Sequence, residues 1–317
     1  MPGAATTDVL GRPYTRETIE LPDDAEGPVV ATLVRKPTRK RRGRAVLHVH
    51  GFADYFFQRE YAEWWTERGY TFYALDLRKY GRSILPHQTP NFVEDLAEYY
   101  PEIDAAWQRI TERDGHDAVV ISAHSTGGLT MPLWAHDQQP TELTAMVLNS
   151  PWLDLQGAGW LRNPATRAAL DQLGARQPRR TIPRRVDTTY GRALHVSGGG
   201  EFDYNLDWKP LESWPVHAGW LRAIRRGHDR VHRGIDVPAP VLVLSSKVSG
   251  TAATPGAVDS ADLVLDVTQI RRWASSLGRH VTSIAVDGAR HDMVLSVPEV
   301  RPRVYAEVDR WLTAYVE

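Results

Sequence analysis

The stretch AVVISAHSTGG, residues Ala118–Gly128, joins a short apolar run to the beginning of a helical pattern. An uninterrupted apolar run of this length is typical of a strand buried on both faces of a sheet, and the spacing over Gly127–Asp137 predicts a helix. Ser125 stands at the turn between the two, with small residues two positions before and after it, Ala123 and Gly127. This is the setting of the G-x-S-x-G nucleophile elbow, with alanine in place of the first glycine, in which a sharp turn lifts the serine hydroxyl clear of the sheet. We therefore predict that Ser125 is a nucleophile; the alternative is an ordinary serine in a glycine-rich turn.

Similar apolar runs recur along the chain and alternate with segments of helical spacing. The runs are Val29–Val34, Ala45–Val49, Thr71–Leu75, Ala118–Ser122, Ala145–Asn149, Val241–Ser246 and Val281–Val286. The helical segments are Arg59–Arg68, Asn91–Arg113, Gly127–Asp137, Val267–Leu277 and Pro298–Tyr315, with Asn91 and Asp266 as expected N-caps. Because strands alternate with helices, we predict an α/β fold in which helices flank a mostly parallel central sheet.

The alternation breaks between Pro151 and about Gly234. This stretch is rich in tryptophan, glycine and proline and shows no strand–helix rhythm. A stretch of this length between two sheet strands predicts an inserted cap over residues 151–234, with the core formed by residues 1–150 and 235–317. The alternative is a set of long connections packed against the sheet.

Composition excludes several classes of protein. The 317 residues carry 38 Lys and Arg against 39 Asp and Glu, a formal net charge of -1, which argues against a dedicated nucleic-acid binder. The absence of cysteine excludes a disulfide framework, cysteine-ligated zinc and thiol nucleophiles. The N-terminal sequence lacks the pattern of a signal peptide, and no uncharged apolar run reaches transmembrane length. We expect a cytoplasmic protein without stable membrane insertion, and we leave open a homo-oligomer.

A second motif, HVHGFAD over His48–Asp54, follows the apolar run Ala45–Val49. A His-Gly pair at this place can set a backbone N–H beside the nucleophile, so we predict an oxyanion hole formed by the N–H groups of Phe52 and Thr126. The competing interpretation of His48 and His50 is a metal-binding pair at alternate strand positions. We predict no metal, because such a site needs further ligands and no carboxylate partner is evident.

The general base is expected after the last apolar run, in the segment GARHD that ends at Asp292. A histidine there, His291, can reach back over the serine, and it completes the chain order Ser, Asp, His. The acid should follow the run Val241–Ser246. We favour Asp262; Asp266 is the less favoured candidate because it is already expected to cap a helix, and Asp259 and Asp154 are further alternatives.

These motifs together resemble the α/β-hydrolase superfamily, and within it the monoacylglycerol lipase and lysophospholipase-like serine hydrolases that are grouped with serine aminopeptidases. The segment DLRKYGRS over Asp76–Ser83 is similar to the DLRGHGRS of that family, with Lys79 and Tyr80 in place of Gly-His. The segment DLVLD from Asp262 to Asp266 is similar to its D-x-V-x-D acid segment. The resemblance implies a serine hydrolase that cleaves a carboxylic ester through a Ser-His-Asp triad and an acyl-enzyme, without a cofactor.

Aromatic residues are abundant in and directly after the predicted oxyanion segment, at Phe52, Tyr55, Phe56 and Phe57, and in the predicted cap. If they line the pocket, the substrate is small and apolar: a monoacylglycerol- or lysophospholipid-like ester, an aryl ester or a lactone. The predicted pocket residues are Tyr55, Phe56, His124, Trp152, Tyr204, Trp208 and Trp214. Two alternatives stay open, namely an amide, peptide (aminopeptidase-like) or C–C bond hydrolase on the same triad, and a non-catalytic ligand receptor on the same fold.

Overall fold

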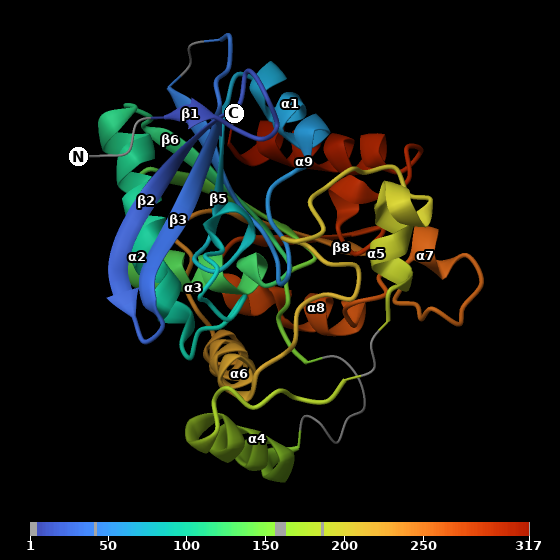
Figure 1. Ribbon diagram of the computed structural model, residues 1–317. Coiled ribbons are helices and arrows are strands. Elements are labelled where there is room, and N and C mark those ends of the chain that lie inside the picture. The colour runs from blue at the N-terminus through green and yellow to red at the C-terminus, as the bar shows by residue number, and fades with distance from the viewer. Residues whose placement is uncertain (1–4, 41–42, 156–162, 185–186, 317) are drawn as a thin grey trace.

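A nine-stranded sheet runs through the computed structural model, which describes residues 5–40, 43–155, 163–184 and 187–316 (Figure 1). The strands are β1 (Thr6–Thr7), β2 (Thr15–Asp24), β3 (Gly27–Lys36), β4 (Arg44–Val49), β5 (Thr71–Asp76), β6 (Ala118–His124), β7 (Leu143–Asn149), β8 (Val241–Ser246) and β9 (Val281–Val286). Their order in the sheet is β1-β2-β3-β5-β4-β6-β7-β8-β9. All pairs from β5 to β9 are parallel, and β1, β2 and β3 are joined antiparallel at one edge. The mostly parallel α/β sheet predicted from the apolar runs is thereby confirmed.

The central strands are buried on both faces, as their continuous apolar sequences predict. Every residue of β5 and β8 is buried, and so is every residue of β4 after the first. The strand β2 was not predicted, because it is an edge element with one solvated face. Along it the buried Glu17 and Ile19 alternate with the exposed Thr18 and Glu20, so its polar residues hide the strand pattern.

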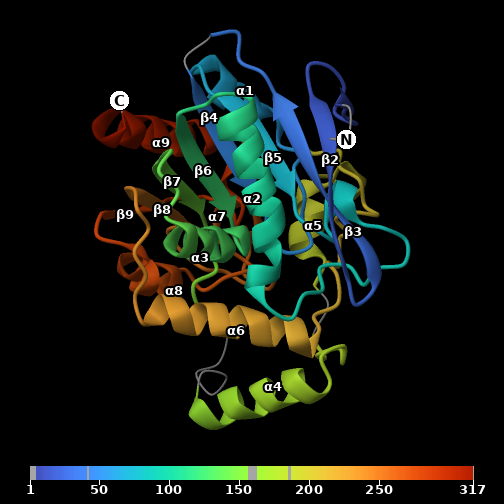
Figure 2. The same cartoon turned by 90° about the vertical axis from the view of Figure 1, so that its left-hand side faces the viewer.

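Helices cover both faces of the sheet. They are α1 (Arg59–Glu67), α2 (Tyr100–Gln108) between the 3-10 helix η2 (Leu96–Tyr99) and the π-helical segment η3 (Arg109–Arg113), α3 (Gly127–Gln138), α8 (Val267–Trp273) continued by the 3-10 helix η6 (Ala274–Leu277), and α9 (Arg301–Tyr315). Two hydrophobic clusters divide them: α2, α3 and α8 pack on one face, α1 and α9 on the other (Figure 2). One expected cap is wrong. Asn91 has a left-handed φ of 63°, and Asp95 caps the helical region instead, because its side chain accepts the N–H of Ala97.

The segment between β7 and β8 contains helices that its sequence did not reveal. They are α4 (Pro164–Arg176), α5 (Thr189–Leu194), the short turn η5 (Val196–Gly198) and α6 (Ala218–His232). Figure 2 shows α6 lying across one end of the sheet below α3, with α4 on its outer side. We call residues 151–234 the insertion; within it, residues 156–162, including Trp160, and residues 185–186 lie outside the described part. That it forms a separate cap stays a prediction.

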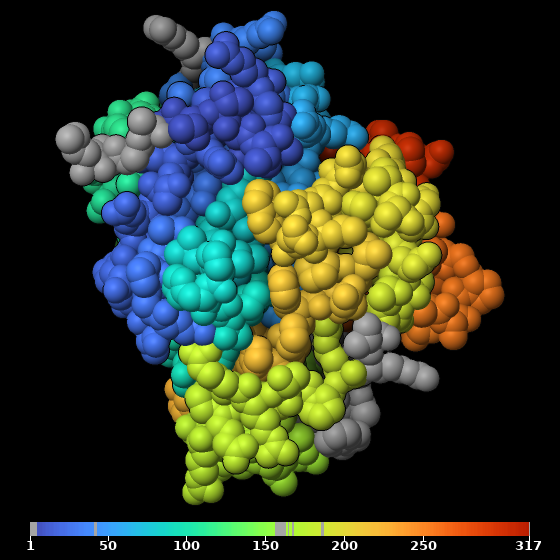
Figure 3. Space-filling model, viewed as in Figure 1, coloured from blue at the N-terminus to red at the C-terminus, as the bar shows by residue number. Residues whose placement is uncertain are grey.

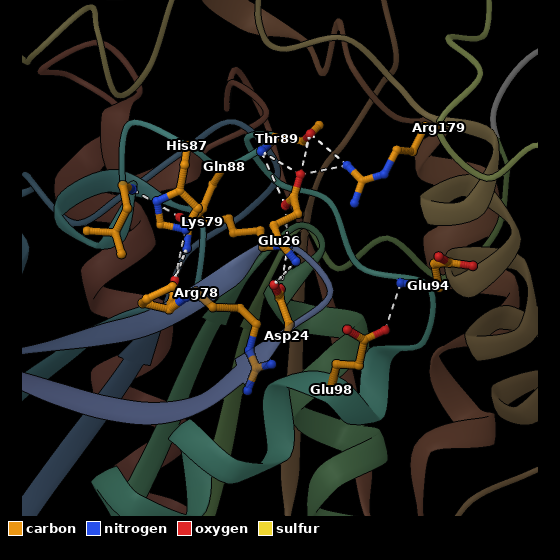
Figure 4. A network of polar contacts seen from close by, with 12 residues as sticks. Asp24, Glu26, Arg78, Lys79, His87, Gln88, Thr89, Glu94, Glu98 and Arg179 are labelled. Atoms are coloured by element: carbon orange, nitrogen blue, oxygen red, sulfur yellow. Dashed lines mark hydrogen bonds and ion pairs between the residues drawn. The ribbon is translucent and has the colours of Figure 1, made fainter.

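On the face shown in Figure 3, the yellow and yellow-green insertion lies against the blue and cyan N-terminal part of the chain. A network of ion pairs fastens it to the N-terminal hairpin (Figure 4). Arg179 of the insertion donates to Glu26 in the β2–β3 turn at 2.6 Å, and the buried Lys79 contacts both Glu26 and Asp24 at 2.6 Å. Burial acts to raise the pKa of Glu26, but hydrogen bonds from Lys79, Thr89 and Arg179 outweigh it and lower the pKa to about 2. Lys79 has a φ of 63°, the region that favours glycine, which is the residue that the similar family segment carries there.

The helices of the described ranges include none that combines the length and the apolar character needed to span a bilayer.

Candidate active site

Ser125 lies at the turn between β6 and α3, where the backbone is strained. Its φ of 51° lies in the left-handed region, which for a residue other than glycine costs on the order of 1–3 kcal/mol and is found where the surroundings enforce it. The end of β7 and the loop after it hold this turn: the Ser125 N–H donates to the carbonyl of Asn149, the last residue of β7, at 3.0 Å, and the Ser125 carbonyl accepts the N–H of Trp152 at 2.9 Å. A Cβ on Gly127 would lie 2.5 Å from the carbonyl oxygen of His50, so a glycine is required at that position.

The imidazole of His291, in the loop after β9, lies between Ser125 and Asp262. Its Nε2 is 3.1 Å from the Ser125 Oγ, and its Nδ1 is 2.9 Å from Asp262 Oδ2. All three residues are buried. The other carboxylate oxygen, Oδ1, accepts the backbone N–H groups of Val264 at 2.8 Å and Leu265 at 2.7 Å, so the acid is oriented from behind. The structure thus brings together the serine, histidine and favoured aspartate, which lie in the connections that follow three different strands.

The other carboxylates considered for the acid have different partners. Asp266 caps α8, where its Oδ1 accepts a backbone N–H of the first turn at 3.0 Å. Asp259, on the short helix α7 (Ala257–Ser260), is ion-paired with Arg290. Asp154 accepts the indole N–H of Trp273 at 3.3 Å. None of these contacts involves the imidazole of the candidate base.

The residues that carry the predicted oxyanion donors follow two adjacent strands of the sheet. Phe52 follows β4 and Thr126 follows the serine at the end of β6, and β4 and β6 pair in parallel with Val49 opposite Ala123. Thr126 is also the N-cap of α3, so its N–H belongs to the positive end of that helix. Both residues line the cavity beside the serine. That their N–H groups form the oxyanion hole stays a prediction.

The cavity beside Ser125 has a volume of about 450 Å³, and its lining divides into an aromatic and a polar group. In the aromatic group, the rings of Phe52 and Trp220 lie 4.2 Å apart, and those of Trp220 and Trp152 lie 5.8 Å apart. Val216 and Leu263–Leu265 extend this apolar surface. Besides Ser125, His291 and Thr126, the polar and charged lining residues are Asp54, His124, Arg184, Asp187, Tyr190, Tyr204, Lys209, Glu212 and Ser213.

Comparison with known proteins decides the family. The sequence model of the family Hydrolase_4, described as serine aminopeptidase of type S33, matches residues 40–296, which is most of the chain. The chain belongs to this family. It is therefore an α/β-hydrolase, in agreement with the superfamily resemblance stated above.

Individual relatives are more distant. Phospholipase YtpA of Bacillus subtilis (strain 168) is 28% identical over 112 residues, which are 35% of this chain and 41% of the phospholipase. The match thus spans about two fifths of that relative. Among solved structures, the monoacylglycerol lipase of Paleococcus ferrophilus is similar with a TM-score of 0.66, 20% identity, and coverage of 89% of this chain and 98% of the lipase. A soluble variant of the monoglyceride lipase of Saccharomyces cerevisiae gives a TM-score of 0.67, 16% identity and 94% coverage of both chains.

Three of the predicted pocket residues, His124, Trp152 and Tyr204, line the cavity of the hydrolase. Four others do not. Phe56 is fully buried against Phe72 in the core, and Tyr55 turns its hydroxyl to a backbone N–H of the insertion.

The remaining two aromatics pack among themselves. Trp208 makes an edge contact with Tyr55, and the indole of Trp214 donates to the carbonyl of Trp208 at 3.4 Å. The sequence prediction missed Trp220, Tyr190 and Lys209 of the lining. Trp220 lies on the buried face of α6, whose helical spacing could have marked it, whereas nothing local marks the other two.

The two histidines considered as a metal pair have separate roles in the hydrolase. The His50 ring is hydrogen-bonded at both nitrogens, through Nδ1 to the Gly51 carbonyl at 2.8 Å and through Nε2 to the N–H of Leu77 at 3.1 Å. His48 lies 3.2 Å from the hydroxyl of Ser122, and burial lowers its pKa to about 4. Their ring nitrogens do not converge on a common ligand position.

A different trio of described residues has metal-like spacing. Ligand atoms of Asp54, His124 and Asp292 lie within 4.8 Å of one another, and all three residues are buried. A side chain already supplies a positive charge beside these residues, because Lys209 Nζ lies 2.7 Å from Asp54 Oδ1. Asp292 is held by amide donors from Asn149 at 2.7 Å and from Gln58 at 3.1 Å, so a cation would have to compete with an existing network.

Proposed function

We propose that this hydrolase cleaves the carboxylic ester bond of an apolar substrate by way of an acyl-enzyme. The observation that carries the proposal is the hydrogen-bonded chain from Ser125 through His291 to Asp262, which opens into a cavity with an aromatic lining. A nucleophile, a base within hydrogen-bond reach and a group that orients the base are the parts that acyl transfer needs.

In this mechanism Ser125 Oγ attacks the ester carbonyl carbon while His291 Nε2 takes the hydroxyl proton. The carbonyl oxygen becomes negatively charged and accepts hydrogen bonds from the N–H groups of Phe52 and Thr126. The imidazolium then gives its proton to the departing alcohol, and Asp262 stabilises the charged ring throughout. Water, activated by the same imidazole, releases the acid and restores the serine. None of these steps calls for a cofactor.

The cavity supports an apolar acyl or aryl group. Its volume of about 450 Å³ lies within the ~300–1,000 Å³ of small-molecule sites, and the Phe52, Trp152 and Trp220 rings offer a surface for a chain or a ring. A monoacylglycerol- or lysophospholipid-like ester, an aryl ester and a lactone all fit this description, and two relatives carry the names monoacylglycerol lipase and phospholipase. We further propose that residues 151–234 act as a cap over the core of residues 1–150 and 235–317. The cytoplasmic location and the absence of a nucleic-acid partner stay predictions from the sequence.

Labelling with a fluorophosphonate tests the nucleophile. The wild-type protein is expected to be labelled and Ser125→Ala is not. Equal labelling of the two would assign the reactive residue elsewhere, and an unlabelled, folded wild type would favour the non-catalytic receptor.

A substrate panel then tests the bond. We expect turnover of p-nitrophenyl esters, monoacylglycerols, aryl esters or lactones, and none of it in Ser125→Ala. Cleavage of aminoacyl amides alone would overturn the ester proposal in favour of an aminopeptidase-like activity.

A further inference from the structure

The oxyanion segment, residues Phe52–Phe57, has a backbone that needs support. Ala53, directly after the residue that carries the predicted oxyanion N–H, has a φ of 49°. An alanine in this left-handed region is disfavoured, because its Cβ crowds the following carbonyl, and the conformation persists only where neighbouring contacts enforce it. The contacts that support Ala53 therefore also help to set the position of the predicted oxyanion N–H.

The support for this segment comes from the insertion. Lys209 Nζ lies 2.7 Å from Asp54 Oδ1. The N–H of Asn205 donates to the hydroxyl of Tyr55 at 2.7 Å. Three successive contacts thus join the oxyanion segment to residues 204–209, the third being the ring of Phe57, which lies 4.8 Å from that of Tyr204. The two segments are about 150 residues apart in sequence, so only the folded chain brings them together.

The ion pair is the contact whose loss should cost most, because both charges are withdrawn from water and neither is easily left without a partner. The Lys209 side chain is 15% exposed and that of Asp54 is 3% exposed. Among the described residues, Lys209 provides the one hydrogen bond to the Asp54 carboxylate, whose other oxygen has no partner. Burial acts to raise the pKa of Asp54, but the charge of Lys209 and the nearby histidines outweigh it and hold the pKa below its usual range. A buried carboxylate that lost this ammonium would be driven to move, and the strained Ala53 would move with it.

We propose that Lys209 is a positioning residue, which through Asp54 holds the Phe52 N–H at the place where the substrate oxygen becomes negatively charged. This proposal rests on the proposed ester hydrolysis. It assigns residues 204–209 of the insertion a part in forming the oxyanion hole, beyond covering the cavity. Lys209 also lines the cavity, so the experiment must separate positioning from direct contact with the substrate.

The test compares Lys209→Met with Lys209→Arg. A donor displaced by about 1 Å costs up to ~100-fold in rate, so kcat of Lys209→Met toward a p-nitrophenyl ester should fall about 10- to 100-fold. KM should stay near the wild-type value, because the hole binds the transition state and not the ground state. The affinity for a trifluoromethyl ketone, which forms a tetrahedral oxyanion with the serine, should fall in parallel with kcat. Lys209→Arg keeps the charge and should retain most of the activity.

Two further variants serve as controls. The double variant Asp54→Asn, Lys209→Met leaves no unpaired charge, folds more readily than the single variant, and should still have a low kcat because the tether is missing. Arg179→Met breaks another ion pair between the insertion and the core, at 2.6 Å from Glu26, and should keep the wild-type kcat.

Several results would overturn the proposal. One is an unchanged kcat in folded Lys209→Met, and another is a rise in KM without loss of ketone affinity, which would make Lys209 a substrate contact. Recovery of kcat in the double variant would show that the unpaired Asp54 charge, and not the missing tether, lowers kcat in Lys209→Met. If wild-type protein is not labelled by a fluorophosphonate, the proposed function itself fails, and this inference fails with it.

Discussion

Replacing Asp262 by asparagine should convert the histidine base into its inactive tautomer. The carboxylate has two roles: Oδ2 accepts the Nδ1–H of His291 at 2.9 Å, and Oδ1 accepts the backbone N–H groups of Val264 and Leu265. An asparagine offers one oxygen and one NH₂ group. Keeping the two backbone bonds requires the oxygen to stay at the Oδ1 position, so the NH₂ group must face the imidazole.

The size of the effect follows from this geometry. Opposite an NH₂ donor, the Nδ1 of His291 must accept a hydrogen bond, so the ring proton sits on Nε2. Because that proton points at the Ser125 hydroxyl, the ring can no longer take the hydroxyl proton. Rotating the amide the other way would leave two buried backbone donors facing an NH₂ group, at a cost of about 1–3 kcal/mol each. A wrong tautomer of this kind lowers kcat by ~10⁴ in a Ser-His-Asp enzyme, which corresponds to about 5.4 kcal/mol of transition-state stabilisation.

Asp266→Asn is the matched control for the assay. It makes the same chemical change four residues away, at the N-cap of α8, and asparagine caps a helix as well as aspartate does. Steady-state hydrolysis of a p-nitrophenyl ester by the two variants should therefore show a large loss of kcat for Asp262→Asn and wild-type turnover for Asp266→Asn. The opposite pattern, with both proteins folded by circular dichroism, would refute the assignment of the acid.

Two further changes test the elbow and the fastening of the insertion. Gly127→Ala would place a Cβ 2.5 Å from the carbonyl oxygen of His50. Because overpacking against rigid backbone is costly, we expect the free energy of unfolding to fall by about 1–3 kcal/mol and kcat to fall as well. An unchanged melting temperature would contradict this. Glu26 has a pKa lowered to about 2 from its ordinary 4.5, so its carboxylate stabilises the fold above pH 4.5, and this contribution is lost as the pH falls through about 2. Urea unfolding of Glu26→Gln across that range should show a flatter pH dependence than wild type, and parallel curves would count against the role of the Arg179 and Lys79 contacts.

The predicted strands were recovered because their signal is local. A strand buried on both faces must be apolar throughout, and each such run in the sequence became a strand. The strand β2 escaped prediction because its solvated face carries Thr18 and Glu20. The helix α6 escaped although its buried residues follow helical spacing, because small and polar residues such as Gly227 and His228 share that face with Trp220 and weaken its apolar pattern.

The residues of the candidate site likewise fall into those that the local sequence marks and those that only the fold places. The elbow around Ser125 was predictable because the sterics of a sharp strand-to-helix turn depend on the residues within two positions of the serine. His291 was predictable from its place after the last strand, whereas chain order alone left several aspartates open and only the structure places Asp262 beside the imidazole. Of the pocket residues, Phe56 and Tyr55 were misplaced, because an aromatic side chain gives no local sign of whether it faces a cavity or the core.

The sequence by itself therefore determined the strand–helix alternation, the nucleophile turn and the residue types of the triad, since each rests on the sterics or the burial of short segments. The tertiary structure alone decided which aspartate meets the imidazole, which rings line the cavity and that Lys209 meets Asp54. The physical reason is that these contacts join segments up to about 170 residues apart, and their geometry is set by how the sheet, the helices and the insertion pack together.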